Sequence, residues 1–331
     1  MRLRVLEANN VIEVLLSKLK KRTPVSARQL IVLGTACQVP TRQRNHNGYF
    51  VKWDDEGFLF DPGEGTQRQM TLAGVAASQI TKIFISHFHG DHCLGLPGVV
   101  QRISLDEVQH PIHVFFPASG EIFYRRLVQA AIFQAKQKLI PHPIEKSGVI
   151  FESDKLIFKA QLLDHTVDSV GYRIQEKETI NFIPERLEKA NIRGGLIGKF
   201  KDAGKISVDG NNYFLKDFVT RKRGSSFTYI LDTRFCQQAV DLAADSDVLL
   251  CEATYMSDRE DMAGKFGHLT AAQSGKLARL AGVRKLYLTH FSQIYSDSGD
   301  FVREAEQEFN QVTALEDLQR FDLPRSKRLV K

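Results

Sequence analysis

Cysteine is scarce in this chain, whose 331 residues include four, at positions 37, 93, 236 and 251. The four are far apart and no two form a CxxC pair. The sequence therefore suggests neither a disulfide framework nor a zinc knuckle built from paired thiolates. Scattered single cysteines fit a protein of a reducing compartment.

Long apolar runs are also lacking. No uninterrupted apolar stretch approaches the roughly 20 residues of a membrane span, and the N-terminus has no signal-peptide core followed by a small-residue cleavage site. We therefore expect a cytoplasmic protein with no membrane segment. Hydrophobic residues make up 43% of the chain, which is ample for a sizeable core in one large domain or two average ones.

Neither sign of charge is in strong excess. The formal net charge of +6 and the calculated pI of about 9 fit a polyanionic partner but do not identify one. Residues 1–28 alone carry a net +5, with apolar residues at helical spacing. We predict a basic, helical N-terminal extension over 1–28, followed by one domain over 29–331. A phosphate-binding or organelle-targeting segment would give the same pattern, but we favour a solvated amphipathic helix.

The clearest chemical signal is the stretch SHFHGDHCLGLPG at 86–98. It follows a short apolar run, Lys82 to Ile85, that reads as a buried strand. In an extended or loop backbone, side chains two residues apart point the same way. His87 and His89 are therefore expected to bind one ion, with Asp91 and His92 turned toward a second. Imidazole and carboxylate are ligands that suit a zinc-like divalent ion, whereas a solvated surface run of histidines would not need the embedded aspartate.

Other strand-like runs also end in residues that can bind metal or carry protons. The five such positions are His87, His165, Asp232, Glu252 and His290. Residues at the ends of several strands can build one site on a sheet, and this set can hold two ions with a shared carboxylate. His268 comes just before a predicted helix that opens with a Thr270–Gln273 capping box and ends near Gly282. The combination predicts a two-metal hydrolase.

Three further segments are candidates for contact with a substrate. The strand exit DPGEGTQ at 61–67 holds two acids, and the polar, basic loop at 38–45 contains Arg42 and Arg44, which either meet phosphates or are merely solvated. Residues 176–224 are rich in Lys, Arg and Gly and read as an insertion or protruding arm. The candidate contacts are Arg42, Arg44, Asn45, Glu64, Thr66, Lys199 and Lys201.

From about residue 30 to 295 the chain resembles ribonuclease Z, the metallo-β-lactamase-fold endoribonuclease that trims the 3′ ends of tRNA precursors. The resemblance is carried by the 86–98 stretch together with DPGEGTQ, LDHT at 163–166, LDTR at 231–234, CEAT at 251–254, GHLTA at 267–271 and THFS at 289–292. It implies an α/β fold, an αββα sandwich with an inserted arm for the tRNA body. It also implies a homodimer acting on precursor tRNA.

The resemblance also implies the roles of the site residues. One zinc would be held by His87, His89 and His165, the other by Asp91, His92 and His290, with Asp232 bridging the two. Mn²⁺ or another divalent ion is the alternative to zinc. Hydroxide activated by the metals would attack phosphorus with Asp91 as proton acceptor, and His268, oriented by Glu252, would protonate the leaving 3′ oxygen. The products would be a tRNA 3′-hydroxyl and a trailer with a 5′-phosphate.

The chain departs from the family pattern at two positions. Leu231 stands where the family usually has glycine before the bridging aspartate, and Arg193-Gly194-Gly195-Leu196 occupies the likely place of a Gly-Pro motif in the arm. Two other functions compete with tRNA processing. One is hydrolysis of a small phosphodiester or sulfate ester on the same scaffold, because the metals do not choose the substrate. The other is a non-catalytic RNA-binding subunit, which the complete ligand set disfavours.

Overall fold

The computed structural model describes residues 28–326. The helix predicted for residues 1–28 lies outside this range except for Arg28. None of the helices in 28–326 is long and apolar enough to cross a membrane.

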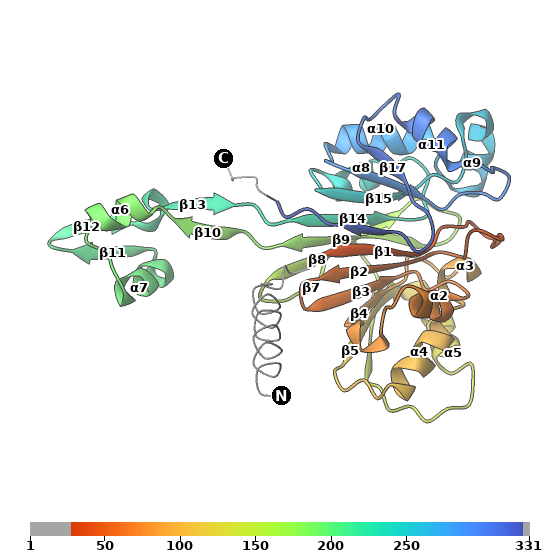
Figure 1. Ribbon diagram of the computed structural model, residues 1–331, viewed down its shortest axis with the longest axis horizontal. Helices are drawn as coiled ribbons and strands as arrows, with labels where there is room; N and C mark the ends of the chain where they lie inside the picture. The colour runs from red at the N-terminus through yellow and green to blue at the C-terminus, as the bar shows by residue number, and fades with distance from the viewer. Residues whose placement is uncertain (1–27, 327–331) are drawn as a thin grey trace, which may run out of the picture.

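Two seven-stranded sheets lie face to face, and each has an antiparallel part and a parallel part (Figure 1). The first sheet, in spatial order, consists of β18 (Arg320–Asp322), β1 (Gln29–Gly34), β2 (Gly48–Trp53), β3 (Glu56–Phe60), β4 (Lys82–Phe84), β5 (Ile112–Pro117) and β6 (Leu139–Ile144). The second consists of β17 (Val312–Ala314), β16 (Leu286–Thr289), β15 (Val248–Glu252), β14 (Ser226–Ile230), β9 (Ser169–Glu176), β8 (Leu156–Leu163) and β7 (Gly148–Glu152).

Helices cover the outer face of each sheet. Over the first sheet lie α2 (Thr66–Leu72), α4 (Leu96–Leu105) and α5 (Glu121–Val128), with the single turn α3 (Gly90–Cys93) at its end. Over the second lie α8 (Gln237–Ala243), α10 (Ala271–Ala281) and α11 (Ser298–Ala305), with α9 (Glu260–Phe266) nearby. The α10 capping box and its C-terminal Gly282 are confirmed. The predicted αββα sandwich is confirmed as well.

The core between the sheets is built largely from aromatic side chains. Phe60 of the first sheet stacks on Phe84 at 4.9 Å and on Tyr229 of the second sheet at 4.7 Å between ring centroids. Rings of this size bury a large apolar area and fix the spacing of the two sheets. Leu231, where the resembled family usually has glycine, is also fully buried in this core, so its side chain is accommodated between the sheets.

The strand directions bring the predicted site residues to one end of the sandwich. Strands β3, β4 and β5 are parallel to one another, as are β14, β15 and β16. Strand β8 runs in the same direction as β14, because each is antiparallel to β9. The carboxyl ends of these strands therefore share one edge in each sheet.

The insertion between β9 and β14 forms an arm that extends away from the sandwich (Figure 1). Its stalk is the antiparallel pair β10 (Thr179–Phe182) and β13 (Val219–Lys222). Its tip contains α6 (Pro184–Lys189), α7 (Gly195–Ala203), β11 (Lys205–Val208) and β12 (Asn211–Phe214), packed around a small core that includes Phe200 and Phe218. Asp209 and Gly210 both have positive φ, as a tight two-residue hairpin turn requires.

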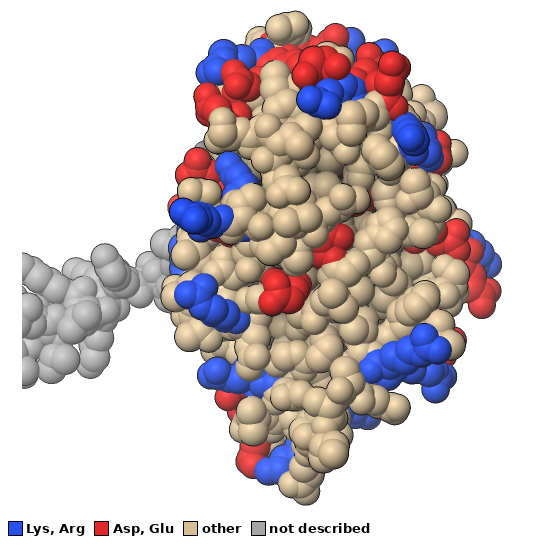
Figure 2. All heavy atoms as spheres, turned by 90° about the vertical axis from the view of Figure 1, so that its right-hand side faces the viewer, with Lys and Arg blue, Asp and Glu red and all other residues tan. Residues whose placement is uncertain are grey.

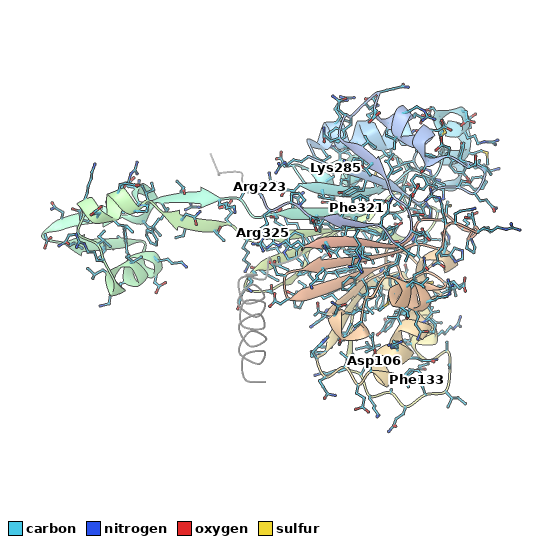
Figure 3. The ribbon with its side chains drawn as sticks, in the orientation of Figure 1. Asp106, Phe133, Arg223, Lys285, Phe321 and Arg325 are labelled. Atoms are coloured by element: carbon cyan, nitrogen blue, oxygen red, sulfur yellow. The ribbon has the colours of Figure 1, made fainter. Side chains whose placement is uncertain are left out.

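Charged residues connect the root of the arm to both sheets. Arg28 lies 2.6 Å from both Asp54 and Glu176, the last residue of β9. Arg325 contacts Asp54 at 2.9 Å, and Arg223 at the end of the stalk donates to the carbonyl oxygen of Asp245 (Figure 3). The arm leaves from the end of β9 and returns at the start of β14, so it lies at the opposite end of the sandwich from the site residues.

Candidate metal centre

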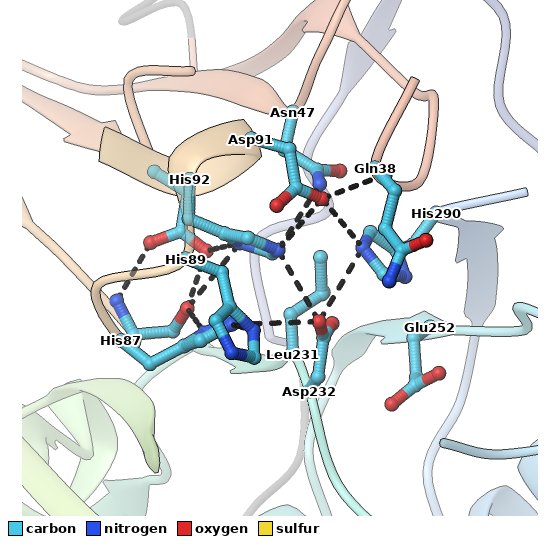
Figure 4. Close-up of polar contacts among 12 residues, drawn as sticks. Gln38, Asn47, His87, His89, Asp91, His92, Leu231, Asp232, Glu252 and His290 are labelled. Atoms are coloured by element: carbon cyan, nitrogen blue, oxygen red, sulfur yellow. Dashed lines mark hydrogen bonds and ion pairs between the residues drawn. The ribbon is translucent and has the colours of Figure 1, made fainter. Parts of the chain in front are cut away.

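Five strand ends converge on one buried cluster. His87 follows β4, His165 follows β8, Asp232 follows β14, Glu252 ends β15 and His290 follows β16. Figure 4 shows that His87, His92, Asp91 and His290 surround the carboxylate of Asp232. The structure thus brings together in space the seven predicted metal ligands, which span some 200 residues of the chain.

The local backbone of the histidine stretch differs from the extended or loop conformation that the alternation argument assumed. Residues 90–93 form the helical turn α3, and His89 is its N-cap in an extended conformation. Asp91 and His92 therefore point inward from adjacent helical positions, with Asp91 Oδ2 3.4 Å from His92 Nε2. The helical turn rotates Asp91 and His92 away from His87 and His89. The two pairs of side chains therefore still face different parts of the cluster.

The first ligand group consists of three imidazoles whose nitrogen atoms face one another. His89 Nδ1 lies 2.9 Å from His87 Nε2 and 3.4 Å from His165 Nε2. Burial is the largest cause that lowers the pKa of all three, and neighbouring histidines lower it further. Neutral imidazole is the form that binds metal.

Hydrogen bonds on the far side of these rings set their tautomers. His165 Nδ1 lies 2.7 Å from the carbonyl oxygen of Gly267, which can only accept. Ser86 donates its hydroxyl proton to Asp61 at 2.6 Å, so it accepts from His87 Nδ1 at 3.0 Å. The Nε2 atoms of both histidines are thus left as lone pairs directed at His89. A cation between the three rings would satisfy this arrangement.

The second ligand group combines carboxylates with imidazoles. His290 Nε2 is 3.4 Å from Asp91 Oδ2 and 3.4 Å from Asp232 Oδ2, which also lies 3.2 Å from His92 Nε2. The same Asp232 oxygen is 3.7 Å from His87 of the first group. Burial would raise the pKa of Asp232, but His290 and His92 outweigh it and hold the pKa well below the usual range. Asp232 therefore lies as a carboxylate between the two groups.

Two buried atoms at this centre have no hydrogen-bond partner among residues 28–326: Asp232 Oδ1 and His290 Nε2. A buried polar atom without a partner is costly and calls for an explanation such as an ion. The donor set of imidazole nitrogens and carboxylate oxygens fits a zinc-like divalent ion. The site therefore supports a bound divalent metal.

Residues behind the ligands orient them, and sequence reasoning missed most of these. Asp61 accepts from His92 Nδ1 at 2.7 Å and also from Ser86 and Tyr229. Thr254 lies 2.7 Å from His290 Nδ1. Partners of this kind fix the ring orientation and tautomer of a metal-binding histidine. The acids of DPGEGTQ gave a signal for Asp61, whereas no pattern pointed to Thr254.

His268 and Glu252 form a hydrogen-bonded pair beside the predicted metal ligands. His268 Nδ1 is 3.1 Å from Glu252 Oε2, which also accepts from the backbone N–H of Leu269 at 3.1 Å. Burial would lower the pKa of His268, but the charge and hydrogen bond of Glu252 and the charge of Asp232 raise it to about 9. Positive charge bound at the centre would oppose this rise. In the absence of bound metal this pKa favours a protonated His268 next to the ligand cluster. Its Nε2 forms no hydrogen bond with any residue in the range 28–326.

A cavity of about 470 Å³ opens onto this cluster. Its lining includes the site residues His89, Asp91, His165, Asp232 and His268, and also Gln38, His46, Leu94, Thr166 and Phe266. Figure 2 views this end of the sandwich, where Lys and Arg side chains lie mainly around the margin of the face and a small group of acidic side chains lies near its middle. Acidic side chains also lie along much of the margin, so the face has no continuous basic rim.

The residues predicted to contact substrate differ in their exposure and in their hydrogen bonds. Arg42, Glu64, Lys199 and Lys201 are exposed, Glu64 beside the cavity residue His46 and the two lysines on α7 of the arm. Thr66 is fully buried and donates to Gly63 O. Arg44 donates to Thr35 Oγ1 and Leu315 O, and Asn45 donates to Glu64 O. The side chains of these last three residues hold the loops together instead of projecting into the cavity.

Comparison with known proteins first defines the class. Residues 41–174 match the model of the metallo-beta-lactamase superfamily, and residues 213–291 match a beta-lactamase superfamily domain. The structure is similar to the crystal structure of human tRNase Z, short form, with a TM-score of 0.66 and 26% identity over 89% of this chain and 99% of that one. A metallo-beta-lactamase fold protein from Bacillus subtilis shares the fold, with a TM-score of 0.65 at 15% identity over 90% of this chain and 99% of that one. The fold and site are those of the metallo-β-lactamase superfamily.

Curated relatives narrow the class to a family. The chain is 48% identical to a ribonuclease Z from Nocardia farcinica and 42% identical to one from Chlamydia caviae. Each comparison covers 91% of this chain and 99% of the relative. The chain belongs to the ribonuclease Z family.

Proposed function

We propose that this protein is a zinc-dependent endoribonuclease that removes 3′ trailers from tRNA precursors. The observation that carries the proposal is the juxtaposition of the two ligand groups through Asp232, with the protonated His268 beside them, in a chain of the ribonuclease Z family. Two adjacent ions and a nearby acid suit hydrolysis of a phosphodiester. A non-catalytic RNA-binding role has no need of these groups.

In this proposal, His87, His89 and His165 would hold one ion and Asp91, His92 and His290 the other, with Asp232 available to both. When bound, two zinc ions lower the pKa of a water molecule and stabilise the negative charge that develops on the phosphoryl oxygens. The carboxylate of Asp91 accepts the proton of the attacking water. Its Oδ2 is already fixed by the backbone N–H of Gln38 at 2.8 Å.

His268 donates a proton to the leaving group. As water bonds to phosphorus, the bond from phosphorus to the 3′ oxygen of the tRNA breaks, and His268 Nε2 protonates that oxygen. Glu252 holds the ring by its Nδ1 and stabilises its charge. The products are a tRNA with a 3′-hydroxyl and a trailer with a 5′-phosphate.

We further propose that the arm, including Lys199 and Lys201, binds the tRNA body through its phosphates. The arm and the site lie at opposite ends of the sandwich, so one tRNA does not easily meet both on one chain. This arrangement supports a homodimer in which the arm of one copy serves the site of the other. A cytoplasmic location remains a prediction.

Mapping of the cleavage site on a precursor tRNA with a 3′ trailer tests the function. We expect one cut at the end of the tRNA body, a 3′-hydroxyl on the tRNA fragment, and loss of cleavage after treatment with a chelator. Readdition of Zn²⁺ should restore it, and parallel readdition of Mn²⁺ shows whether that ion can substitute. Hydrolysis of a small model diester with no cleavage of the precursor would contradict the proposal and favour a small-diester hydrolase of the same fold.

A further inference from the structure

The thiol of Cys37 lies beside the second ligand group, in a loop that is hydrogen-bonded to Asp91 and to the neighbour of His290. The backbone N–H of Cys37 donates to the carbonyl oxygen of Phe291, next to His290, at 3.1 Å. The adjacent N–H of Gln38 donates to Asp91 Oδ2 at 2.8 Å. The backbone on both sides of the Cys37 side chain is thus held against the strand end and the helical turn that supply His290 and Asp91.

The three side chains are close enough to share an ion. Cys37 Sγ and the ligand atoms of Asp91 and His290 all lie within 4.8 Å of one another, and all three residues are buried. Buried atoms this close, drawn from three separate segments of the chain, form a built site instead of a chance approach at a surface.

Among residues 28–326, neither the Cys37 thiol nor His290 Nε2 has a hydrogen-bond partner. Cys37 Sγ forms no hydrogen bond with any residue in the range 28–326, whereas Cys93 Sγ donates to His89 O at 3.2 Å. His290 Nε2 is buried and unpartnered as well. A cation bound between these atoms and Asp91 would satisfy both.

We propose that Cys37 is a thiolate ligand of the ion held by Asp91, His92 and His290. The inference deepens the proposed two-ion centre and rests on it, but it does not depend on which phosphodiester is cleaved. Thiolate is a soft ligand that favours Zn²⁺ and Co²⁺ over Mn²⁺ or Mg²⁺. Cys37 would therefore make this half of the centre selective for zinc.

Zinc X-ray absorption of the unmodified protein provides a test that needs no variant. With two zinc ions bound, we expect one sulfur neighbour per two zinc ions, at about 2.3 Å. Two bound zinc ions with only nitrogen and oxygen neighbours would overturn the role of Cys37 and leave the two-ion centre standing. A protein that binds no zinc would overturn both proposals.

Cobalt substitution assigns the sulfur to a residue. The Co²⁺ form should show a near-ultraviolet thiolate-to-cobalt charge-transfer band that is retained in the control Cys236→Ser and lost in both Cys37→Ser and Cys37→Ala. The preference for Zn²⁺ over Mn²⁺ in competition binding should fall roughly tenfold or more in the Cys37 variants. Persistence of the band in both variants, or an unchanged preference in folded variants, would overturn the proposal. If neither variant folds, the zinc spectrum of the unmodified protein decides.

Discussion

The hydroxyl of Thr254 lies 2.7 Å from Nδ1 of His290 and donates its own proton to Glu252 at 2.6 Å. Because that proton is committed to Glu252, the oxygen accepts from His290 Nδ1 and leaves Nε2 free to bind metal. Glu252 also holds His268. One carboxylate thus supports both the proposed acid, His268, and, through Thr254, a proposed metal ligand, His290.

Thr254→Val should therefore impair metal binding without loss of the fold. The substitution preserves shape but removes the acceptor that fixes the His290 ring, and loss of such a partner costs about 10- to 100-fold in metal affinity or activity. Zinc affinity by competition with a chromogenic chelator provides the measurement. Thr254→Ser keeps the hydroxyl and should remain close to the parent. An affinity unchanged in the valine variant would show that Thr254 does not orient His290.

Asp61→Asn should also weaken metal binding by the second ligand group, in this case through His92 instead of His290. Asp61 Oδ2 receives His92 Nδ1, the Ser86 hydroxyl and the Tyr229 hydroxyl, each within 2.7 Å. If the asparagine NH₂ took the place of Oδ2, it would face three donors. If it took the place of Oδ1, it would face the Ser86 N–H, which lies 2.6 Å from Oδ1.

We expect the asparagine variant to lose about 10- to 100-fold in zinc affinity and also to lose thermal stability. The control is Asp106→Asn, which removes a charge at an exposed helix end (Figure 3) and should change neither property. Equal zinc affinities in the two variants would contradict the role given to Asp61.

The backbone of Gly63 packs closely against the backbone carbonyl oxygens of Asp91 and Asn47. A Cβ at Gly63 would lie 2.2 Å from Asp91 O and 2.7 Å from Asn47 O, and neither is the flexible end of a side chain. Gly63→Ala should therefore destabilise the protein by about 1–3 kcal/mol or more and weaken zinc binding by shifting α3. Chemical denaturation with and without zinc measures both effects.

Gly264→Ala provides the matched control for Gly63. A Cβ there meets no atom within 4 Å, and the residue lies inside α9, where alanine is favoured over glycine by about 0.5–1 kcal/mol. The control should be slightly more stable than the parent. A Gly63 variant as stable as this control would refute the packing argument.

Replacing residues 180–221 by an Asn-Gly turn should separate tRNA binding from chemistry. Thr179 and Lys222 are paired across the stalk, so a two-residue turn can join them. Without the arm, cleavage of precursor tRNA should fall roughly tenfold or more, because phosphate contacts dominate nucleic-acid affinity, while hydrolysis of a small diester stays near normal. Equal losses in both assays would contradict the proposed role of the arm.

The same variant tests whether the arm acts across a dimer. Mixed and re-associated with His268→Ala, it would form heterodimers whose intact site faces the intact arm of the other chain. Random pairing should return roughly a quarter of the parental sites. A mixture no more active than its two components would contradict action across a homodimer.

The sequence predicted that these polar residues would meet because most of them follow apolar strands, and the carboxyl ends of parallel strands lie at one edge of a sheet. His87 and His290 were visible in this way although 202 positions separate them. The contacts of Thr254 and Asp61 with the histidines were not predicted, because each contact depends on the relative placement of loops. No spacing in the chain encodes such a contact.

The roles of the candidate substrate contacts could not be predicted from the sequence either. Thr66 is the first residue of α2, and Arg44 and Asn45 lie in a polar loop. At such positions a side chain that binds the backbone and one that binds a ligand give the same sequence pattern. In the structure these three satisfy backbone and hydroxyl groups of neighbouring loops. The fold of the arm was not predicted either, because its short strands and helices pack around a core of few residues.

His268→Ala should reduce cleavage while leaving the metal centre intact. The ring lies 3.9 Å from Asp232, yet its Nδ1 is engaged by Glu252, so its removal takes away a proton donor and no ligand of either proposed ion. General acid catalysis contributes about 10²- to 10⁴-fold, and a loss of that size is expected for precursor tRNA. Zinc content and tRNA affinity should stay near the parental values. The loss should be much smaller with a diester whose leaving group needs no proton, such as a nitrophenolate. A variant that loses zinc, or loses both substrates equally, would show that His268 holds the centre together instead of protonating the leaving oxygen.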